Sequence, residues 1–204
     1  MAYQSHSLTV VAPAASKLLC TLDDVKVELG LSGSADDAAL TARIGQASDA
    51  IAASCDRVFA RETVQETFRG LSCQGPLRLE RQPVASIVSV AVDGQAFSAG
   101  DYEVDADGRL WRLSGDALAG WAGSKVVVTY AGGYLLPEDA SPTLPLELRR
   151  ACIDRVVRGW SSVGRDPWIR SESTEGVDSI SFFDPDKLSA EDDGVFAKYR
   201  RVLV

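Results

Sequence analysis

A run of short strands between residues 76 and 134 constrains this fold more than any other stretch of the chain. Period-2 spacing places four valines near its start on one face, which predicts a strand with one buried face. They are Val84, Val88, Val90 and Val92. Asp93-Gly94 and Asp107-Gly108 then interrupt the run, and Asp-Gly is a strong hairpin signal because both residues tolerate positive φ. The stretch therefore predicts a module of antiparallel hairpins.

Two helical patterns lie before this module. Thr21 is a good N-cap for a short first helix, which should end at Gly30. A second helix of about six turns is expected next, with Ser34 as its cap. Its apolar residues recur at steps of three and four, which places them on one face that packs in a core. This face consists of Leu40, Ile44, Ala47, Ile51, Cys55 and Val58.

A third helical pattern follows the module. Pro145 suits the first position of a helix and ends a proline-rich connector. Apolar residues then recur at steps of four and predict a face that packs against neighbouring helices. They are Leu148, Cys152, Val156 and Trp160. Four arginines on the opposite face favour a solvated surface or salt bridges to another subunit over nucleic-acid binding. They are Arg149, Arg150, Arg155 and Arg158.

Three segments outside these patterns carry weaker signals. Residues 61–69 alternate, with Glu66 on the apolar side, and predict an edge strand. Residues 114–124 are rich in glycine and predict a loop or a single helical turn. Residues 1–20 are expected to form a mobile or docked N-terminal arm in which His6 is frayed.

The last forty residues change in character. Residues 177–183 alternate briefly and predict a lone strand, and Ser189 is expected to cap a short final helix. This arm holds many large apolar side chains for a segment of low helical content, so we expect them to form a subunit or partner interface. They are Trp168, Ile169, Phe182, Phe183, Phe196 and Tyr199.

Composition limits the possible functions. The formal net charge of −8 and the sequence pI of about 4.7 argue against general affinity for nucleic acid or an anionic membrane. The chain contains no apolar run long enough to span a bilayer and no basic signal-peptide start, so we expect a soluble product made in the cytosol. The four cysteines are far apart and are expected to be isolated small apolar side chains rather than zinc ligands.

Signatures of catalysis are absent from the sequence. It has no phosphate-binding glycine motif, no nucleophile elbow, no zinc-protease helix and only one histidine, so we expect neither an enzyme nor a bound cofactor or metal. Gly132-Gly133 could bind phosphate, but a turn that ends a strand is favoured. Four alternating carboxylates could hold a hard cation or hydrolyse a substrate, although a solvated strand face is favoured. They are Asp101, Glu103, Asp105 and Asp107.

A small ligand- or carbohydrate-binding module flanked by helices is the alternative function that the residues leave open. Four aromatic side chains of the central stretch could form a stacking platform for such a ligand. They are Trp111, Trp121, Tyr130 and Tyr134. Packing of the same rings in hairpins or in the core is favoured over such a platform.

The order of these patterns resembles the head–tail connector, or adaptor, proteins of long-tailed double-stranded DNA phages and phage-like gene transfer agents. The resemblance covers about residues 18 to 162 and rests on a short helix, an alanine-rich helix, a hairpin module and a third helix, in that order. The motifs are Leu22-Asp-Asp-Val-Lys-Val-Glu-Leu-Gly, Asp37-Ala-Ala-Leu, Pro83-Val-Ala-Ser-Ile-Val-Ser-Val-Ala-Val-Asp-Gly, Asp101-Tyr-Glu-Val, Gly108-Arg-Leu, Val126-Val-Val-Thr-Tyr-Ala-Gly-Gly-Tyr and Pro145-Leu-Glu-Leu-Arg-Arg-Ala-Cys-Ile.

The resemblance implies a structural role without enzymatic activity. Proteins of this family form a ring, dodecameric in the family, beneath the portal of a filled capsid. The ring extends the DNA channel and offers a surface to the head-completion protein or the tail, and DNA passes without specific binding. The expected location is therefore the head–tail junction of a virion assembled in a bacterial cytoplasm.

The residues and the resemblance together predict an α+β fold. We expect a helical bundle, an antiparallel module of hairpins inserted between its second and third helices, and an extended C-terminal arm that ends in a short helix. The corresponding division of the chain is an arm over 1–20, bundle helices over 21–60, the inserted module over 61–135, the third helix over 136–164 and the C-terminal arm over 165–204.

Overall fold

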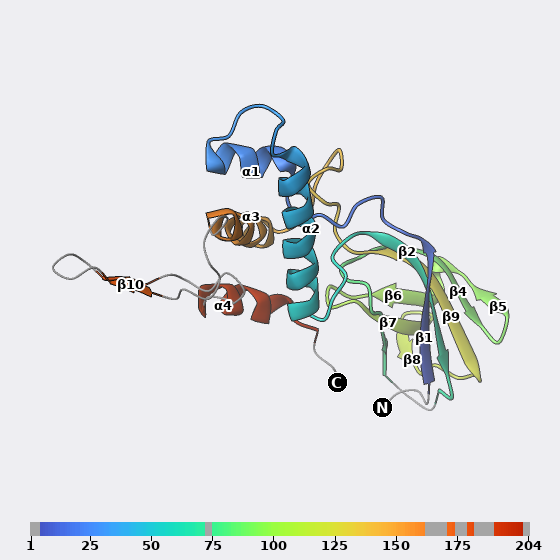
Figure 1. Cartoon of the computed structure of the whole chain (residues 1–204). Coiled ribbons are helices and arrows are strands. Elements are labelled where there is room, and N and C mark those ends of the chain that lie inside the picture. Colours follow the sequence, from blue (N-terminus) through green and yellow to red (C-terminus); the bar gives the residue numbers. More distant parts are fainter. Residues whose placement is uncertain (1–4, 72–74, 162–170, 174–178, 182–189, 202–204) are drawn as a thin grey trace. The chain divides into compact units, whose positions relative to one another are not determined.

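The computed structural model describes five stretches of the 204-residue chain: residues 5–71, 75–161, 171–173, 179–181 and 190–201. Within them the chain is α+β, with antiparallel sheets and a short helix near the C-terminus, as the sequence predicts (Figure 1). The chain divides into two compact units. The sheet unit comprises residues 5–17 and 58–143, and the helical unit comprises the described parts of 18–57 and 144–201.

Five strands form the larger sheet of the sheet unit, in the order β1-β2-β9-β4-β5, and every neighbouring pair is antiparallel. They are β1 (Ser5–Ala12), β2 (Glu62–Arg69), β9 (Lys125–Gly132), β4 (Val84–Val92) and β5 (Gln95–Phe97). The prediction that residues 61–69 form an edge strand is wrong, because β2 lies between β1 and β9. The edge is formed by β1, so residues 5–12 are an ordered strand of the sheet.

The smaller sheet orders its strands β3-β7-β6, with β8 also paired to β7. The strands are β3 (Leu77–Arg78), β6 (Tyr102–Val104), β7 (Arg109–Ser114) and β8 (Ala117–Ala119), and a 3-10 turn (Ala99–Asp101) precedes β6. The loop predicted for residues 114–124 is therefore wrong in part. Gly115, at φ 60°, makes the turn that lets Ala117 pair with Ser114.

The Asp-Gly hairpins are confirmed. Asp93 and Gly94 have φ values of 49° and 86°, and Val92 pairs with Gln95 across them. Two central residues with positive φ match the twist of the flanking strands, which is why Asp-Gly suits this loop. The second signal, Asp107-Gly108, lies in the turn between β6 and β7, where Gly108 has φ 70°.

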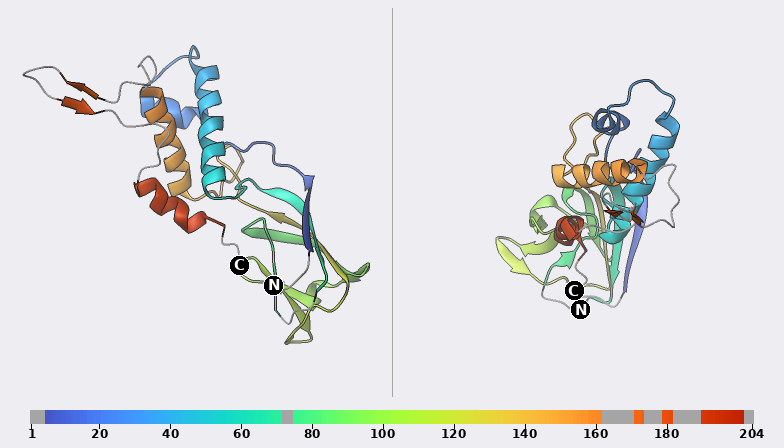
Figure 2. Two further views of the ribbon diagram at one scale, coloured as in Figure 1. Left: turned by 60° about the horizontal axis from the view of Figure 1, so that its bottom comes forward. Right: turned by 60° about the vertical axis from the view of Figure 1, so that its left-hand side comes forward.

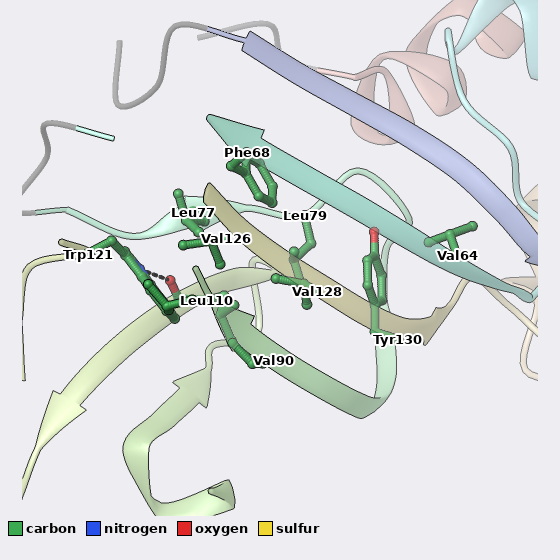
Figure 3. Close-up of a cluster of buried hydrophobic side chains, with 11 residues drawn as sticks. Val64, Phe68, Leu77, Leu79, Val90, Leu110, Trp121, Val126, Val128 and Tyr130 are labelled. Atoms are coloured by element: carbon green, nitrogen blue, oxygen red, sulfur yellow. Dashed lines mark hydrogen bonds between the residues drawn. The ribbon is translucent and has the colours of Figure 1, made fainter. Parts of the chain in front are cut away.

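Side chains from both sheets form one buried core (Figure 3). Tyr130 of β9 is fully buried, and the Trp121 indole Nε1 donates to the Leu110 carbonyl at 3.3 Å. The core cluster consists of Val64, Phe68, Leu77, Leu79, Val90, Val92, Leu110, Trp121, Val126, Val128 and Tyr130.

One valine of the predicted buried face does not pack against this core. Val88 is 64 % exposed. The pairing of β4 with β9 shifts between Val84 and Ser86 and again between Ile87 and Ser89. Each irregularity interrupts the alternation of faces along the strand, so Ile87 packs against the core in place of Val88.

The described residues of the helical unit include four helices, in which α2 packs on α3, α1 packs on both, and α4 packs on α3. They are α1 (Leu22–Leu29), α2 (Asp37–Ser54), α3 (Leu146–Ser161) and α4 (Ala190–Tyr199). Figure 2 shows α2 and α3 side by side. The strands β2 to β9 fall between α2 and α3 in the sequence, which is the predicted order of elements.

The ends of the helices follow the sequence signals only in part. The Thr21 hydroxyl accepts from the Asp24 amide at 3.2 Å, and Gly30 ends α1 at φ 64°, both as predicted. The predicted Ser34 cap is wrong, because the N-cap of α2 is Asp36 and its side chain makes no capping hydrogen bond. Helix α2 ends at Ser54, short of the six turns predicted.

The C-terminal segment contains a two-stranded ladder before α4. The strand predicted within residues 177–183 is found at β11 (Ser179–Ser181), but it is not alone, because β10 (Ser171–Ser173) pairs with it. The predicted Ser189 cap lies outside the described residues. None of the described helices is long and apolar enough to cross a membrane.

Gly132 and Gly133 end β9 where three backbone segments meet. The Gly133 amide donates to the Pro83 carbonyl at 2.9 Å, and the Tyr134 amide donates to the Phe59 carbonyl at 2.7 Å. A Cβ atom on Gly132 would lie 2.2 Å from the Arg81 carbonyl oxygen. The diglycine therefore lies at the end of a strand, where the sequence favoured a strand-ending turn over a phosphate site, and the Gly133 amide is already paired.

We predict that Gly132→Ala destabilises the sheet unit by about 1–3 kcal/mol, because the backbone of the neighbouring segment must move to admit the methyl group. Urea unfolding followed by circular dichroism measures the loss. Gly100→Ala is the matched control, since a Cβ atom there meets nothing within 4 Å. Equal stability of Gly132→Ala and Gly100→Ala would contradict the close approach.

Candidate functional site

The alternating carboxylates of the smaller sheet serve its turns. Asp105 Oδ1 accepts from the amides of Asp107 at 3.0 Å and Arg109 at 2.9 Å. Asp101 closes a capping box at the 3-10 turn, and Glu103 is exposed. Among the residues that the structure describes, no group of three or more His, Cys, Asp or Glu side chains could hold a metal ion. The geometry agrees with the simpler interpretation of these carboxylates, as a strand face with turns.

The aromatic platform suggested for a ligand-binding function does not form. Trp121 is 2 % exposed and Tyr130 is fully buried, so two of the four rings belong to the core. Trp111 and Tyr134 are half-buried. The Trp111 indole Nε1 donates to Asp105 Oδ2 at 3.1 Å, which shows that this ring packs within the hairpin. These three rings therefore pack in the core or the hairpin, which is the use that the sequence favoured over a stacking platform.

A buried carboxylate organises the larger sheet instead. Glu66 of β2 is 0 % exposed. Its Oε2 atom lies 2.8 Å from His6 Nε2, and its Oε1 atom accepts from the Glu80 amide at 2.8 Å and from the Tyr130 hydroxyl. Burial, followed by the neighbouring Glu66, raises the pKa of Tyr130 and keeps its hydroxyl protonated as a donor. We call His6, Glu66, Tyr130 and the Glu80 amide the polar network.

The polar network continues to a second buried acid on the same strand. Glu62 is 3 % exposed, and its Oε2 atom accepts from Arg81 Nε at 3.2 Å. The Arg81 amide in turn donates to the Tyr130 hydroxyl at 2.8 Å. The segment before β4 is thus joined to β2 and β9 by charged and neutral hydrogen bonds that are shielded from water, where such bonds are strongest.

One feature of the sequence could have indicated the polar network. Glu66 alternates with Val64 and Phe68 on the apolar side of its strand, and an acid on a buried face needs hydrogen-bond partners. Those partners could not be identified, because His6 precedes Glu66 by sixty residues in the chain. The prediction that His6 is frayed is wrong: its ring also stacks on Phe68, with centroids 4.9 Å apart.

The predicted packing faces of the helical unit lie inside it. Seven of the eight residues are buried: Leu40, Ile44, Ala47, Ile51, Leu148, Cys152 and Val156. The eighth, Trp160, is half-buried, and the Arg43 guanidinium carbon lies 5.8 Å from its ring centroid. These side chains hold the helices together, and they leave the outer faces for other contacts.

Charged pairs connect α1 to α3 at the edge of this packing. Arg149 donates to both carboxylate oxygens of Asp24, at 2.9 and 2.6 Å, and Arg150 donates to both oxygens of Glu28 at 2.8 Å. Burial tends to raise the pKa of Asp24, but hydrogen bonds from Arg149 and Thr21 outweigh it and hold that pKa below its ordinary value of 3.8. Arg149 and Arg150 are therefore used in contacts within the chain.

The aromatic residues predicted for an interface have different fates. Phe196 is 1 % exposed, so in this conformation it packs within the helical unit. Tyr199 is half-buried, and its hydroxyl donates to Glu147, which also accepts from Lys198 Nζ at 2.9 Å. The other four residues, Trp168, Ile169, Phe182 and Phe183, lie outside the described residues.

Exposed apolar side chains mark the surfaces that remain for a partner. In the helical unit these are Val27, 81 % exposed on α1, and Leu146, 76 % exposed at the start of α3. In the sheet unit the most exposed are Val88, Leu118 and Val11. Such side chains are ordinary when single, so they indicate candidate contact points rather than a defined site.

The comparisons with known proteins bear on function more directly than any cluster of side chains. Residues 20–103 match the family model described as "Phage gp6-like head-tail connector protein". The match begins just before α1 and ends in β6. It confirms the resemblance to head–tail connectors over this part of the chain. A comparison with curated protein sequences gives no significant match.

Solved structures share the fold over nearly the whole chain. A chain in the neck of an empty gene transfer agent (GTA) particle, computed with C6 symmetry, aligns with TM-score 0.57 at 16 % identity and covers 97 % of each chain. A chain in the virion of a native GTA particle aligns with TM-score 0.57 at 17 % identity, over 97 % of this chain and 96 % of that one. A chain in the neck of a native GTA particle, computed with C12 symmetry, aligns with TM-score 0.54 at 18 % identity and covers 97 % of each chain.

We predict that His6→Ala lowers the free energy of unfolding by about 1–3 kcal/mol, because buried Glu66 loses a hydrogen-bond partner. Amide hydrogen exchange should accelerate along β1 first, since His6 attaches that edge strand to β2. Ser7→Ala is the control, because Ser7 is exposed on the same strand. If the two variants exchange alike along β1, the network does not hold the strand.

Acid should weaken the contact between Asp24 and Arg149. A carboxyl whose pKa is lowered on folding contributes stability that is present above the unfolded value, here 3.8, and is lost as the pH falls through the folded value. We predict that Asp24→Asn costs about 1–2 kcal/mol at neutral pH and that the difference from the parent protein shrinks in acid. Urea unfolding across the pH range measures it. Glu28→Gln should cost less, because its pair with Arg150 is more exposed.

Proposed function

We propose that this protein is a head–tail adaptor that forms a ring at the neck of a phage or of a phage-like gene transfer agent. The observation that carries the proposal is the match of residues 20–103 to the head–tail connector family. That region contains α1, α2 and the strands from β2 to β5, so it includes parts of both units. The shared fold with GTA neck and virion proteins supports it over 97 % of the chain.

A ring of twelve copies is the assembly that we infer. The similar chains come from necks computed with C6 and C12 symmetry, and twelve copies satisfy both. A closed ring needs a heterologous interface, in which two different patches of each chain meet. The helical unit and the C-terminal segment would supply these patches, and the ring would bind the portal on one side and a head-completion or tail protein on the other.

The net negative charge of the chain favours passage of DNA through the ring over binding of DNA by it. Tight binding to the phosphate backbone requires several lysine or arginine contacts, whereas this chain carries a net charge of −8. Arg149 and Arg150 of α3 are already paired with acids of α1. A channel wall built from such chains would let DNA move through without specific binding.

The C-terminal aromatic residues are the contacts that we propose for the portal or the neighbouring subunit. Phe196 would contribute indirectly, because it anchors α4 inside the helical unit. Trp168, Ile169, Phe182 and Phe183 would make the direct contacts. Large aromatic side chains provide much of the energy at protein interfaces, which makes these four the first candidates for substitution.

Mixing the purified chain with its cognate portal ring tests the proposal. We predict that the chain, monomeric or already a ring alone, joins the portal as a second ring visible by negative-stain electron microscopy. A Phe182→Ala/Phe183→Ala variant should lose this binding while it keeps the melting temperature of the parent protein. Val88→Ala, which removes an exposed side chain of the sheet unit, is the control and should bind normally. Absence of any complex between the parent chain and the portal would contradict the proposed adaptor role.

A further inference from the structure

Two cysteines that are far apart in the sequence meet inside the helical unit. Cys20, which precedes the N-cap of α1, and Cys152, in α3, are separated by 132 positions, yet their Sγ atoms lie 3.5 Å apart. Both residues are 0 % exposed and both are free thiols. The sequence-based prediction of isolated cysteines is wrong for this pair. Cys55 is also buried, but its Sγ atom contacts the Phe196 carbonyl rather than another thiol.

The surroundings hold the two thiols in place. Ser48 of α2 donates its hydroxyl to the Ile44 carbonyl at 2.7 Å and accepts from the Leu19 amide at 3.0 Å. The same oxygen lies 3.6 Å from Cys152 Sγ. The residue next to Cys20 is therefore fixed to α2, and Cys152 is fixed by its position in α3. The contact between the sulfur atoms is a consequence of how three helices pack.

The hydrogen bond between the thiols makes them chemically different. Cys20 donates to Cys152, and this bond, together with burial, raises the pKa of Cys20. Accepting the same bond lowers the pKa of Cys152 despite its burial. A thiolate is the nucleophile in thiol oxidation, so Cys152 is the sulfur that attacks first.

We propose that Cys20 and Cys152 form a disulfide bond when the protein meets a two-electron oxidant. The two S–H bonds break, one S–S bond forms, and the oxidant takes up two electrons and two protons. Molecular oxygen would be reduced to hydrogen peroxide, and an azodicarboxamide would be reduced to the hydrazine. The sulfur atoms must close from 3.5 Å to the bond length of about 2.0 Å, a movement within reach of rotation about the side-chain bonds.

The bond would join the two separate chain segments that build the helical unit. Residues 18–57 and 144–201 belong to this unit, and the whole of residues 58–143 lies between them in the sequence. Without a disulfide, α3 is held against α1 and α2 by packing, by ion pairs and by hydrogen bonds such as that from Arg43 to the Gly159 carbonyl. A cross-link that closes a long loop removes much of the conformational freedom of the unfolded chain, so it should stabilise the protein substantially.

The redox chemistry does not depend on the proposed function, but its biological setting does. Cytosolic thiols are kept reduced, whereas an extracellular particle is exposed to oxygen. A neck protein would therefore fold and assemble with free thiols and become cross-linked after the particle leaves the cell. The oxidation can be tested on the purified chain alone, so its failure and the failure of the adaptor role are separate results.

Oxidation of the purified full-length protein with diamide, an azodicarboxamide, tests the proposal. We expect the intact mass to fall by two hydrogen atoms and the titratable thiols to fall from four to two. Peptide mapping without reductant should give one linked pair that contains Cys20 and Cys152, and the melting temperature should rise until a reductant reverses both changes. Cys55→Ser should keep the link and the thermal shift, and Cys152→Ala should lose both.

A parallel control experiment measures how fast the reagent can reach the buried thiols. Alkylation of the reduced protein by N-ethylmaleimide gives the rate at which Cys20 and Cys152 become accessible through local opening. Incubation with diamide then runs for several half-times of that reaction. If Cys20 and Cys152 are still unlinked in the parent protein after this time, or if either is linked to Cys55 or Cys73 instead, the proposal is overturned.

Discussion

The helical unit depends on the packing of α3 against α1 and α2, which come from a distant part of the sequence. The chain leaves this unit after residue 57, builds the sheets, and comes back at residue 144. Loop closure over such a distance costs conformational entropy, which the regained contacts must offset. The burial of apolar side chains of α3 such as Leu148 and Val156 contributes to this gain. The bidentate pair of Asp24 with Arg149 adds a directional contact between α1 and α3.

The sheet unit solves a similar problem with buried polar groups. The N-terminal strand β1 must find β2, although some fifty residues of helix and loop lie between them. Backbone pairing alone does not define the register of an edge strand, whereas a single buried acid with few possible partners does. His6 on β1 meets Glu66 on β2, and Tyr130 on β9 meets the same carboxylate. The polar network thus joins three neighbouring strands at one point.

Local signals in the sequence were sufficient for most elements and insufficient for most long-range contacts. The Asp93-Gly94 turn and the Thr21 cap follow from local backbone chemistry, so both could be predicted. The exposure of Val88 could not, because the register irregularities of β4 arise from its pairing with β9. The meeting of Cys20 with Cys152 and of His6 with Glu66 depends on the completed fold, and no local pattern marks it.

The order of the helices and strands along the chain indicated the function, whereas the chemistry of individual side chains did not. Nothing in the aromatic or acidic clusters defines a catalytic or ligand site, whereas the succession of a short helix, a long helix and a hairpin module led to the connector family, which the match over residues 20–103 supports.

The position of the protein in a purified particle tests the adaptor role most directly. A cryo-electron microscopy reconstruction of the neck should contain this fold as a ring of twelve copies directly below the portal. Intact particles that lack the chain at the portal–tail junction would contradict the account.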